Sequence, residues 1–251
     1  MSNSNQAGRF KPVLFGGVAV CVAAVFLSGQ SFAKSPRLGL DLGARAEYVS
    51  NLVNLDKIDR ELFAAKMGSG ERFEGMESLD DIRMPLSAEA WARWKIAKKR
   101  YLKLSILANY NAHLQNSIAD YWKFRARIDF DLTRNNSLRV GARFVPDRFK
   151  RNYKVYSNDS ATYHGGYYDE VRASAEYRYD FGGRNVLGLD YIYADRTYND
   201  VFSGKNRRQN TLAANLKKSL SDNVTLMLEA GYGAAGTEED LNVPAYMAGT
   251  T

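Results

Sequence analysis

The stretch Trp122–Leu132, WKFRARIDFDL, alternates strictly between apolar and charged residues. Successive side chains of a β-strand point to opposite faces, so the stretch predicts a strand with one apolar face and one charged face. On a helix the same residues would mix around the axis. The fold therefore depends on which solvent each face meets.

The same period of two recurs along the chain. The apolar sets fall within residues 38–48, 102–112, 122–132, 138–144, 171–181, 187–193, 212–216 and 224–232. Most of these eight runs are about ten residues long, and alternation over such a length is typical of strands with two different faces. The sequence predicts an all-β chain of about eight to ten strands that form an antiparallel, up-and-down meander.

The connections between the runs differ in length. Short segments at Asn135–Asn136, Gly182–Asn185 and Ser221–Asn223 carry the residues that tight hairpin turns require. Residues 148–167 and 196–208 predict two long polar loops. Short turns at one end and long loops at the other are typical of a transmembrane β-barrel.

Residues 1–33 predict a secretory signal peptide. Two basic residues precede the apolar run Val13–Leu27, and small residues follow it up to Ala33, where we expect cleavage. The run is short for a spanning helix, which favours cleavage over anchoring. The single cysteine, Cys21, lies inside the run, so we expect no disulfide in the exported domain, residues 34–251.

Two interpretations of the alternating faces compete. In a soluble sandwich or a lipocalin-like barrel the apolar face points to a core, whereas in a membrane barrel it points to lipid and the charged residues line the interior. Three features favour the membrane. The runs have the roughly 9–11 residues that a strand needs to cross a bilayer. Tyrosines recur near run ends, and the charged faces carry both signs, so they can pair across strands. The tyrosines are Tyr48, Tyr110, Tyr179, Tyr193 and Tyr232.

With these features the chain resembles the broad class of bacterial outer-membrane β-barrel proteins, including the porin-like ones. The resemblance covers about Leu38–Tyr232 and rests on the strand pattern, the turn asymmetry and the signal peptide. It implies an antiparallel transmembrane barrel in the cell outer membrane. It also implies contact with lipid and lipopolysaccharide, and insertion by the barrel-assembly machinery. It names no solute.

Two regions depart from this pattern. Residues 51–99 are irregular; part of a strand at Ile82–Leu86 and either a short helix or an extension of the next strand at Ala88–Lys99 are open alternatives. Strict up-and-down parity predicts one more strand between Asn51 and Arg100. Members of the class normally have an even strand count and end on a strand with a terminal aromatic residue. The final strand is therefore expected to be incomplete or the sequence truncated, and a short return strand from near Ala245 is the alternative.

The charged residues of the alternating runs are the candidate functional residues. In a wide barrel the cations would give passing solutes an anion bias, as charged rings do in pores. In a barrel of eight to ten strands side chains nearly fill the interior, and cations would pair with Glu170 and the acids named below. The candidate interior charges are Lys103, Lys123, Arg125, Arg127, Asp129, Asp131, Arg139, Arg143, Arg172, Glu176, Arg178 and Asp180.

The sequence gives little indication of catalysis, metal binding or a cofactor. His113 and His164 are the only histidines, and neither stands with a serine and an acid at a recognisable spacing. Asp159, Ser160 and His164 lie close together in a polar segment, as chance would place them. No cluster has the spacing of a closed metal site. The net charge of +7 falls to +5 when Arg9 and Lys11 are removed, which indicates anionic surfaces more than nucleic acid. We expect a structural or porin-like protein, with a surface scaffold, an outer-membrane hydrolase or a soluble ligand-binding barrel as alternatives.

Overall fold

The computed structural model describes residues 35–50, 52, 57–65, 73–157, 160–182, 185–220, 224–237 and 243–249. The chain divides into two compact units, Met1–Ser35 and Pro36–Thr251, and the second contains every helix and strand discussed below. The expected signal peptide, residues 1–33, lies outside the described residues.

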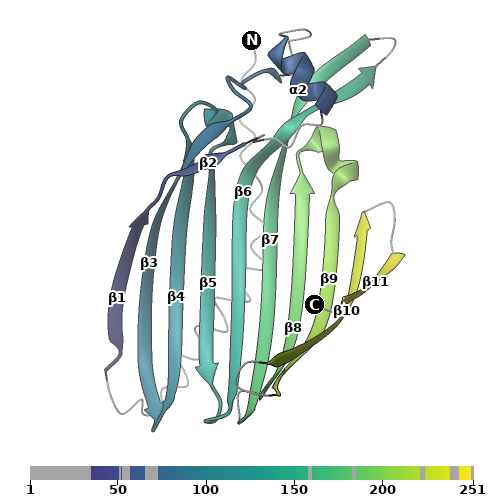
Figure 1. Cartoon of the computed structure of the whole chain (residues 1–251). Coiled ribbons are helices and arrows are strands. Elements are labelled where there is room, and N and C mark those ends of the chain that lie inside the picture. Colours follow the sequence, from purple (N-terminus) through teal and green to yellow (C-terminus); the bar gives the residue numbers. More distant parts are fainter. Residues whose placement is uncertain are drawn as a thin grey trace. The chain divides into compact units, whose positions relative to one another are not determined.

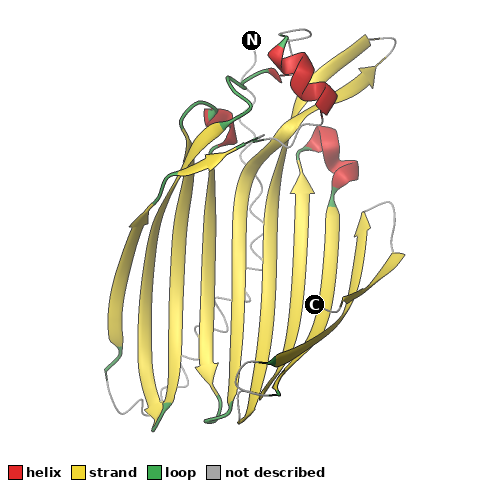
Figure 2. Ribbon diagram, in the orientation of Figure 1, coloured by secondary structure: helices red, strands yellow, loops and turns green. Residues whose placement is uncertain are grey.

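The second unit is an all-β sheet, as the sequence predicts (Figures 1 and 2). Ten strands follow one another along the sheet in the order of the sequence, and the short β2 pairs with β3 beside this path. The strands are β1 (Arg37–Ala44), β2 (Glu47–Val49), β3 (Asp81–Ala97), β4 (Arg100–His113), β5 (Tyr121–Asp131), β6 (Asn136–Ser157), β7 (Ser160–Gly182), β8 (Asn185–Tyr198), β9 (Arg207–Ser219), β10 (Thr225–Thr237) and β11 (Val243–Gly249). The helices are α2 (Lys57–Ala64) and the 3₁₀ helices η2 (Ser117–Ala119) and η3 (Asp200–Lys205).

Every pairing along the sheet is antiparallel, so the up-and-down arrangement is confirmed. All but the last residue of the stretch Trp122–Leu132 lies in β5, which pairs with β4 and β6. Ala126 stands opposite Ile106 on one side and opposite Ala142 on the other. This register keeps apolar residues beside apolar residues across the sheet, because a slip of one residue would exchange the two faces.

The irregular segment contains the strand that parity requires. β3 runs without interruption from Asp81 to Ala97 and pairs with β1 and β4, so the alternative of a helix at Ala88–Lys99 is wrong. Three successive positions of its apolar face, Ala88, Ala90 and Ala92, hold alanine, a weak strand former, which explains the ambiguity of the sequence pattern there. Before it, residues 57–64 form the short helix α2.

The long loop expected at residues 148–167 is absent. β6 and β7 instead continue as a paired hairpin as far as Ser157 and Ser160. Bulges between Val145 and Arg151 shift the register, and Asp147 adopts a positive φ of 44° there. A bulge interrupts the period of two, so the sequence pattern predicts a loop at these residues. Their backbones nevertheless remain paired between β6 and β7. The second expected loop, residues 196–208, is largely strand and η3.

The two ends of the sheet are β1 and β11. β11 is the short return strand that the sequence left as an alternative, and it pairs with β10 from Val243 to Gly249. Among the described residues no hydrogen-bonded pairing joins β1 to β11, so the sheet is not closed by backbone bonds.

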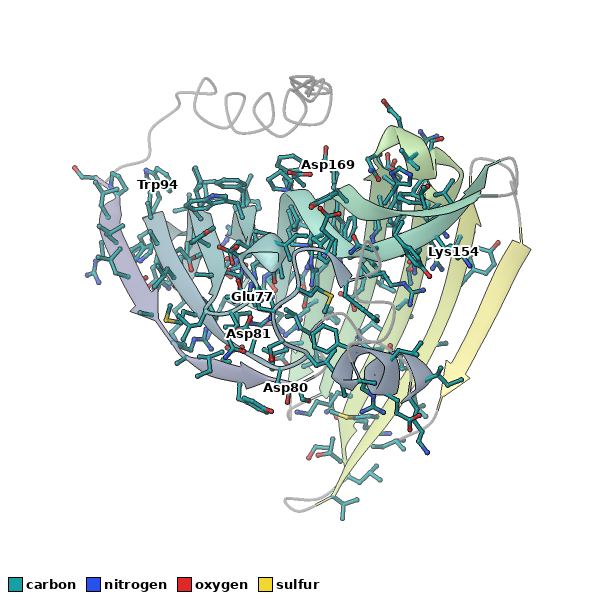
Figure 3. All side chains as sticks on the ribbon, turned by 90° about the horizontal axis from the view of Figure 1, so that it is seen from above. Glu77, Asp80, Asp81, Trp94, Lys154 and Asp169 are labelled. Carbon is teal, nitrogen blue, oxygen red and sulfur yellow. The ribbon has the colours of Figure 1, made fainter. Side chains whose placement is uncertain are left out.

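The sheet has an exposed apolar face and a sheltered polar face. Leu38, Ile106 and Trp122 on the apolar face are 74%, 58% and 46% exposed, whereas Ser105 and Asn109 on the polar face are 3% and 7% exposed. In Figure 3, the view from above, Trp94 lies on the outer side of the curved sheet and Asp81 on its inner side. The polar face is therefore the inner one.

A small apolar core lies at the end of the strands from which the β6–β7 hairpin extends, and it is separate from the exposed apolar face of the sheet. Phe73 and Phe149 are buried in it, and α2 contributes Leu62 and Phe63. The rings of Phe63 and Phe73 meet edge to face with 5.2 Å between their centroids. This core joins α2 and residues 73–80 to the extended hairpin of β6 and β7.

Candidate functional site

The outer face carries a continuous apolar band. On β5 to β7 its central positions hold small or branched residues such as Ala126, Ala142 and Val140, and larger rings lie on both sides of them. Leu102 through Tyr110 on β4 would extend about 27 Å along the strand at about 3.4 Å per residue, which is about 19–22 Å of height at a tilt of about 35–45°, against about 25 Å for a lipid-facing band. The flanking rings are Phe124, Phe144 and Trp122 on one side and Phe130, Tyr177 and Tyr179 on the other.

The band crosses the register of the sheet at a slant. One row of directly paired residues begins at Leu38, the first large apolar residue of β1, and ends at Tyr232, the last of β10. β1 and β10 run in the same direction, since an even number of antiparallel steps separates them. The row therefore starts at one edge of the band and ends at the other, which is the pattern that tilted strands produce.

The expected charges form a chain of ion pairs on the inner face. Asp129 on β5 contacts Arg127 Nε at 2.9 Å and Arg139 Nε at 2.6 Å. Arg139 continues to Glu176 on β7 with Nη1 3.0 Å from Oε2, and Glu176 also pairs with Arg178. These contacts join opposite charges across β5, β6 and β7, as the mixed signs on alternate positions predict.

A second set of ion pairs lies on the same face, nearer to the extended hairpin of β6 and β7. Glu170 on β7, which is 6% exposed, pairs with Arg143 on β6 and with Arg196 Nη2 on β8 at 2.7 Å. Arg125 Nη2 lies 3.8 Å from Glu89 on β3. A charge as sheltered as that of Glu170 requires such partners, because water solvates it poorly.

Several predicted site residues lie outside these chains. Asp131 accepts a hydrogen bond from Tyr101 N and Asp180 accepts one from Gly182 N, and among the described residues neither carboxylate forms the ion pair with an arginine that the sequence predicts. Both lie next to a turn, where a carboxylate can accept a backbone N–H. Lys103 Nζ lies over the Trp91 ring at 5.3 Å. Within the described part of the chain, Lys123 and Arg172 have no ion pair.

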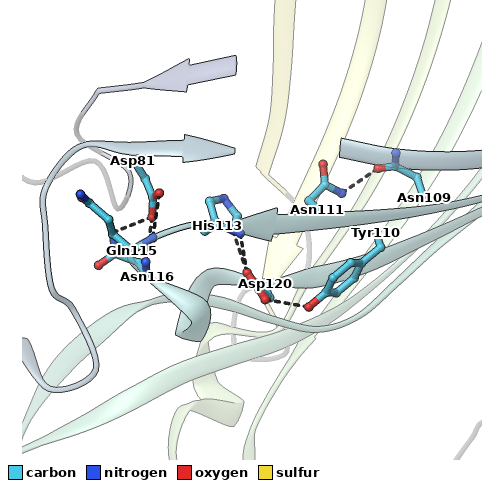
Figure 4. A network of polar contacts seen from close by, with 8 residues as sticks. All are labelled: Asp81, Asn109, Tyr110, Asn111, His113, Gln115, Asn116 and Asp120. Atoms are coloured by element: carbon cyan, nitrogen blue, oxygen red, sulfur yellow. Dashed lines mark hydrogen bonds and ion pairs between the residues drawn. The ribbon is translucent and has the colours of Figure 1, made fainter. Parts of the chain in front are cut away.

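A buried polar network connects the end of β4 to the start of β3 (Figure 4). Asn116 is fully buried; its Nδ2 donates to Asp81 Oδ2 at 2.8 Å, and its Oδ1 accepts from Glu77 N at 2.8 Å. The backbone amides of Gln115 and Asn116 also donate to Asp81. Burial acts to raise the pKa of Asp81, which lies outside the apolar band, but these hydrogen bonds outweigh it and lower the pKa.

The two histidines differ in their surroundings. His113 Nδ1 lies 3.3 Å from Asp120 Oδ1, and Tyr110 donates its hydroxyl to the same carboxylate at 2.7 Å. The His113 side chain is only 2% exposed, so a substrate would have no access to it. His164 lies on β7 instead of in a loop, with its Nε2 3.0 Å from Thr162 Oγ1. The expected neighbour Asp159 lies outside the described residues.

Neither a metal centre nor a spanning helix is found in the described ranges. No three His, Cys, Asp or Glu side chains gather there in a way that could hold an ion. None of the described helices has the length and apolar character to cross a membrane.

Comparisons with family models, with curated proteins and with solved structures give no match for this chain. The candidate site therefore rests on geometry alone. The sequence pattern missed Glu89 and Arg196, which lie in segments that were expected to be irregular or loop. It also missed the Asp81–Asn116 network, because nothing in the sequence brings two residues from different turns together.

Proposed function

We propose that this chain is an outer-membrane β-barrel protein that gives small polar solutes a passive path through the membrane. The observation that supports membrane insertion most strongly is the exposure of the two faces. In a soluble sheet protein the apolar face would be covered and the charged face would meet water. Here large apolar residues are exposed on the outer face, while Ser105, Asn109 and Asn111 on the inner face are buried.

The arrangement of strands supports closure of the sheet. A sheet in lipid must close, because an unpaired backbone group in hydrocarbon costs several kcal/mol. Ten antiparallel strands place β1 and β11 in opposite directions, which allows them to pair as their neighbours do. The slant of the apolar band across the register fits the tilt that closure requires. We infer that β1 and β11 meet when the protein inserts.

The inner face supports passage of polar solutes. It carries charges of both signs along the height of the apolar band, and the side chains of Arg125, Arg139 and Arg178 are 40%, 46% and 60% exposed. Charges with this exposure indicate an interior that holds water. An interior filled with side chains, which would make the barrel structural only, predicts no conductance.

The three tryptophans provide a direct test of membrane insertion. Trp94 and Trp122 belong to the outer face, whereas Trp91 lies on the inner face and donates from Nε1 to Asp41 at 2.9 Å. Three variants, each with one tryptophan and the other two changed to phenylalanine, are inserted into vesicles whose acyl chains carry bromine. We expect strong quenching of Trp94 and Trp122 fluorescence and weak quenching of Trp91.

The membrane proposal would be overturned if Trp91 alone were quenched. It would also be overturned if the protein stayed in solution and did not associate with the vesicles. Electrophoresis of unboiled and boiled samples gives an independent check, since a closed barrel changes its mobility on boiling. Conductance in planar bilayers then tests passage: steps that change when Arg125 is replaced by glutamine support a path, and a silent, folded barrel excludes one.

A scaffold role is the second candidate, and the extended hairpin favours it. β6 and β7 continue beyond the apolar band, where Tyr153 packs on Phe202 with 5.0 Å between ring centroids and Lys205 Nζ lies over Tyr153 at 4.6 Å. An ordered projection of this kind could present a surface to a partner. A silent barrel whose binding to cell-surface material is lost when residues 151–164 are shortened would support this role.

A further inference from the structure

Three arginines stand side by side on the inner face. Arg125 on β5 is directly opposite Arg143 on β6, and Arg143 is directly opposite Arg172 on β7. Neighbouring strands are about 4.8 Å apart, so the three side chains leave the sheet as adjacent members of one row. Like charges in directly opposed positions destabilise a sheet. The row therefore needs a compensating negative charge.

The carboxylates near the row supply only part of that charge. Glu89 pairs with Arg125, and Glu170 is shared between Arg143 and Arg196. Lys123, two residues before Arg125 on the same face, adds a further cation. The five cations thus face two carboxylates, and Arg172 and Lys123 have no ion pair among the described residues.

One donor in the row has no partner. Arg143 Nε is buried, and no hydrogen-bond acceptor within the described part of the chain reaches it. A buried donor without an acceptor costs free energy, so Glu170 does not fully satisfy Arg143, whose side chain is still 35% exposed to an anion at its other atoms. The row also lies within the height of the apolar band, since Ala126 and Ala142, next to Arg125 and Arg143 along their strands, belong to the centre of that band.

We propose that Arg125, Arg143 and Arg172, together with Lys123, form a binding site for a phosphate-type oxyanion on the inner face. The guanidinium group donates in a planar fork that matches the oxygens of phosphate, and several adjacent forks suit an anion with more than one negative charge. The inference deepens the proposed function, because it names the class of solute that the path holds, and it rests on that function for its role in transport. The site itself rests only on the geometry of the inner face.

The test is calorimetric titration of the folded full-length protein in detergent micelles with inorganic phosphate, at constant ionic strength set by chloride. Arg172→Gln removes the arginine of the row that has no ion pair among the described residues. Arg178→Gln is the matched control, because Arg178 lies on the same strand and face but pairs with Glu176 in the other chain of ion pairs. We expect Arg172→Gln to weaken phosphate binding at least about tenfold, the loss of roughly one charge-assisted hydrogen bond, and Arg178→Gln to leave it within about twofold.

Three results would overturn the site: no phosphate binding by folded wild-type protein, equal binding by Arg172→Gln and wild type, or equal loss in both variants. The last would mean that only net charge matters. Mobility on unboiled gels confirms that each variant is folded, and Arg172→Lys should keep part of the affinity. Phosphate binding by a protein that fails the bromine quenching test would reject the membrane proposal and keep the site.

Discussion

A single buried side chain, that of Asn116, links two segments at one end of the sheet. Asn116 uses both ends of its amide, donating to Asp81 and accepting from the backbone of Glu77 and Ser78. It thereby fixes the segment before β3 to the turn after β4. Each bond contributes about 1 kcal/mol, but the loss of one partner leaves the other group buried and unsatisfied, which costs more.

Asn116→Ala should therefore destabilise the protein by about 1–3 kcal/mol. The variant leaves Asp81 Oδ2 without its side-chain donor and two backbone amides without their acceptor. Urea unfolding of the micelle-bound protein measures the change. Asn135→Ala, at an exposed turn, is the control and should change the unfolding free energy by less than about 0.5 kcal/mol. Equal effects of the two substitutions would contradict this account of the network.

Asp81 should also make stability depend on pH. Its pKa is lowered in the folded protein, so the ionised form is stabilised by folding. That contribution is fully present above the unfolded pKa of about 3.9 and is lost as pH falls through the lower folded value. The free-energy difference between wild type and Asp81→Asn should be largest near neutral pH and should shrink below about pH 4. A constant difference across this range would refute the assignment.

Whole strands sort their residues between an outer and an inner face of the sheet. β5 presents Ala126 outward and Arg125 and Arg127 inward, and the register places Ile106 of β4 and Ala142 of β6 beside Ala126 on the outer face. Because the period is two, the sorting follows from alternation alone. Alternation does not tell which of the two faces is the outer one. The exposure of the side chains in the folded sheet shows that it is the apolar face.

A charge placed on the outer face tests that direction. Ala126→Arg should cost about 2–4 kcal/mol in vesicles, because Ala126 lies at the centre of the apolar band. Ala213→Arg is the control: the same change on the inner face, directly opposite Asp190, should cost much less. Folded fractions on unboiled gels after refolding with lipid give the comparison. A larger loss for Ala213→Arg would mean that the faces are reversed.

The edge strand β1 depends on a glycine. Gly39 lies opposite Trp91, and a Cβ at this position would collide with the indole ring. Gly39→Ala should shift Trp91, weaken its bond to Asp41 and cost about 1–3 kcal/mol. At Gly233 on the same face, the nearest atoms to an added Cβ are 3.7 Å away, so Gly233→Ala should be tolerated. A change in Trp91 emission in the control alone would contradict this explanation.

At the scale of the whole molecule, the apolar band lies along the strands of the sheet and the hairpin of β6 and β7 extends beyond it. The proposed membrane position covers the strands at the level of the band and leaves residues 148–167 outside it. Local stability should follow the same division, because in the described residues β7 pairs with β8 only from Tyr168 onward, and the outer part of the hairpin pairs only between β6 and β7.

Trypsin should therefore cut vesicle-inserted protein first within the hairpin, at Arg151 or Lys154, and leave the bond after Lys103 intact. Lys103 lies on β4 between two paired strands, within the protected region. Mass spectrometry of the fragments identifies the order of cleavage, and boiled protein, in which all sites are open, is the control. Early cleavage at Lys103 in vesicles would contradict the proposed position in the membrane.

Sequence alone determined the all-β class, the antiparallel order and the membership of each strand face. Alternation repeats with period two and short turns join neighbouring runs, so these features are local. The tertiary structure decided that the apolar face is the exposed one and that residues 148–167 form a paired hairpin. It also brought Asp81 to Asn116 and set three arginines in one row. These features depend on contacts between residues distant in sequence and on register across several strands, which no local pattern contains.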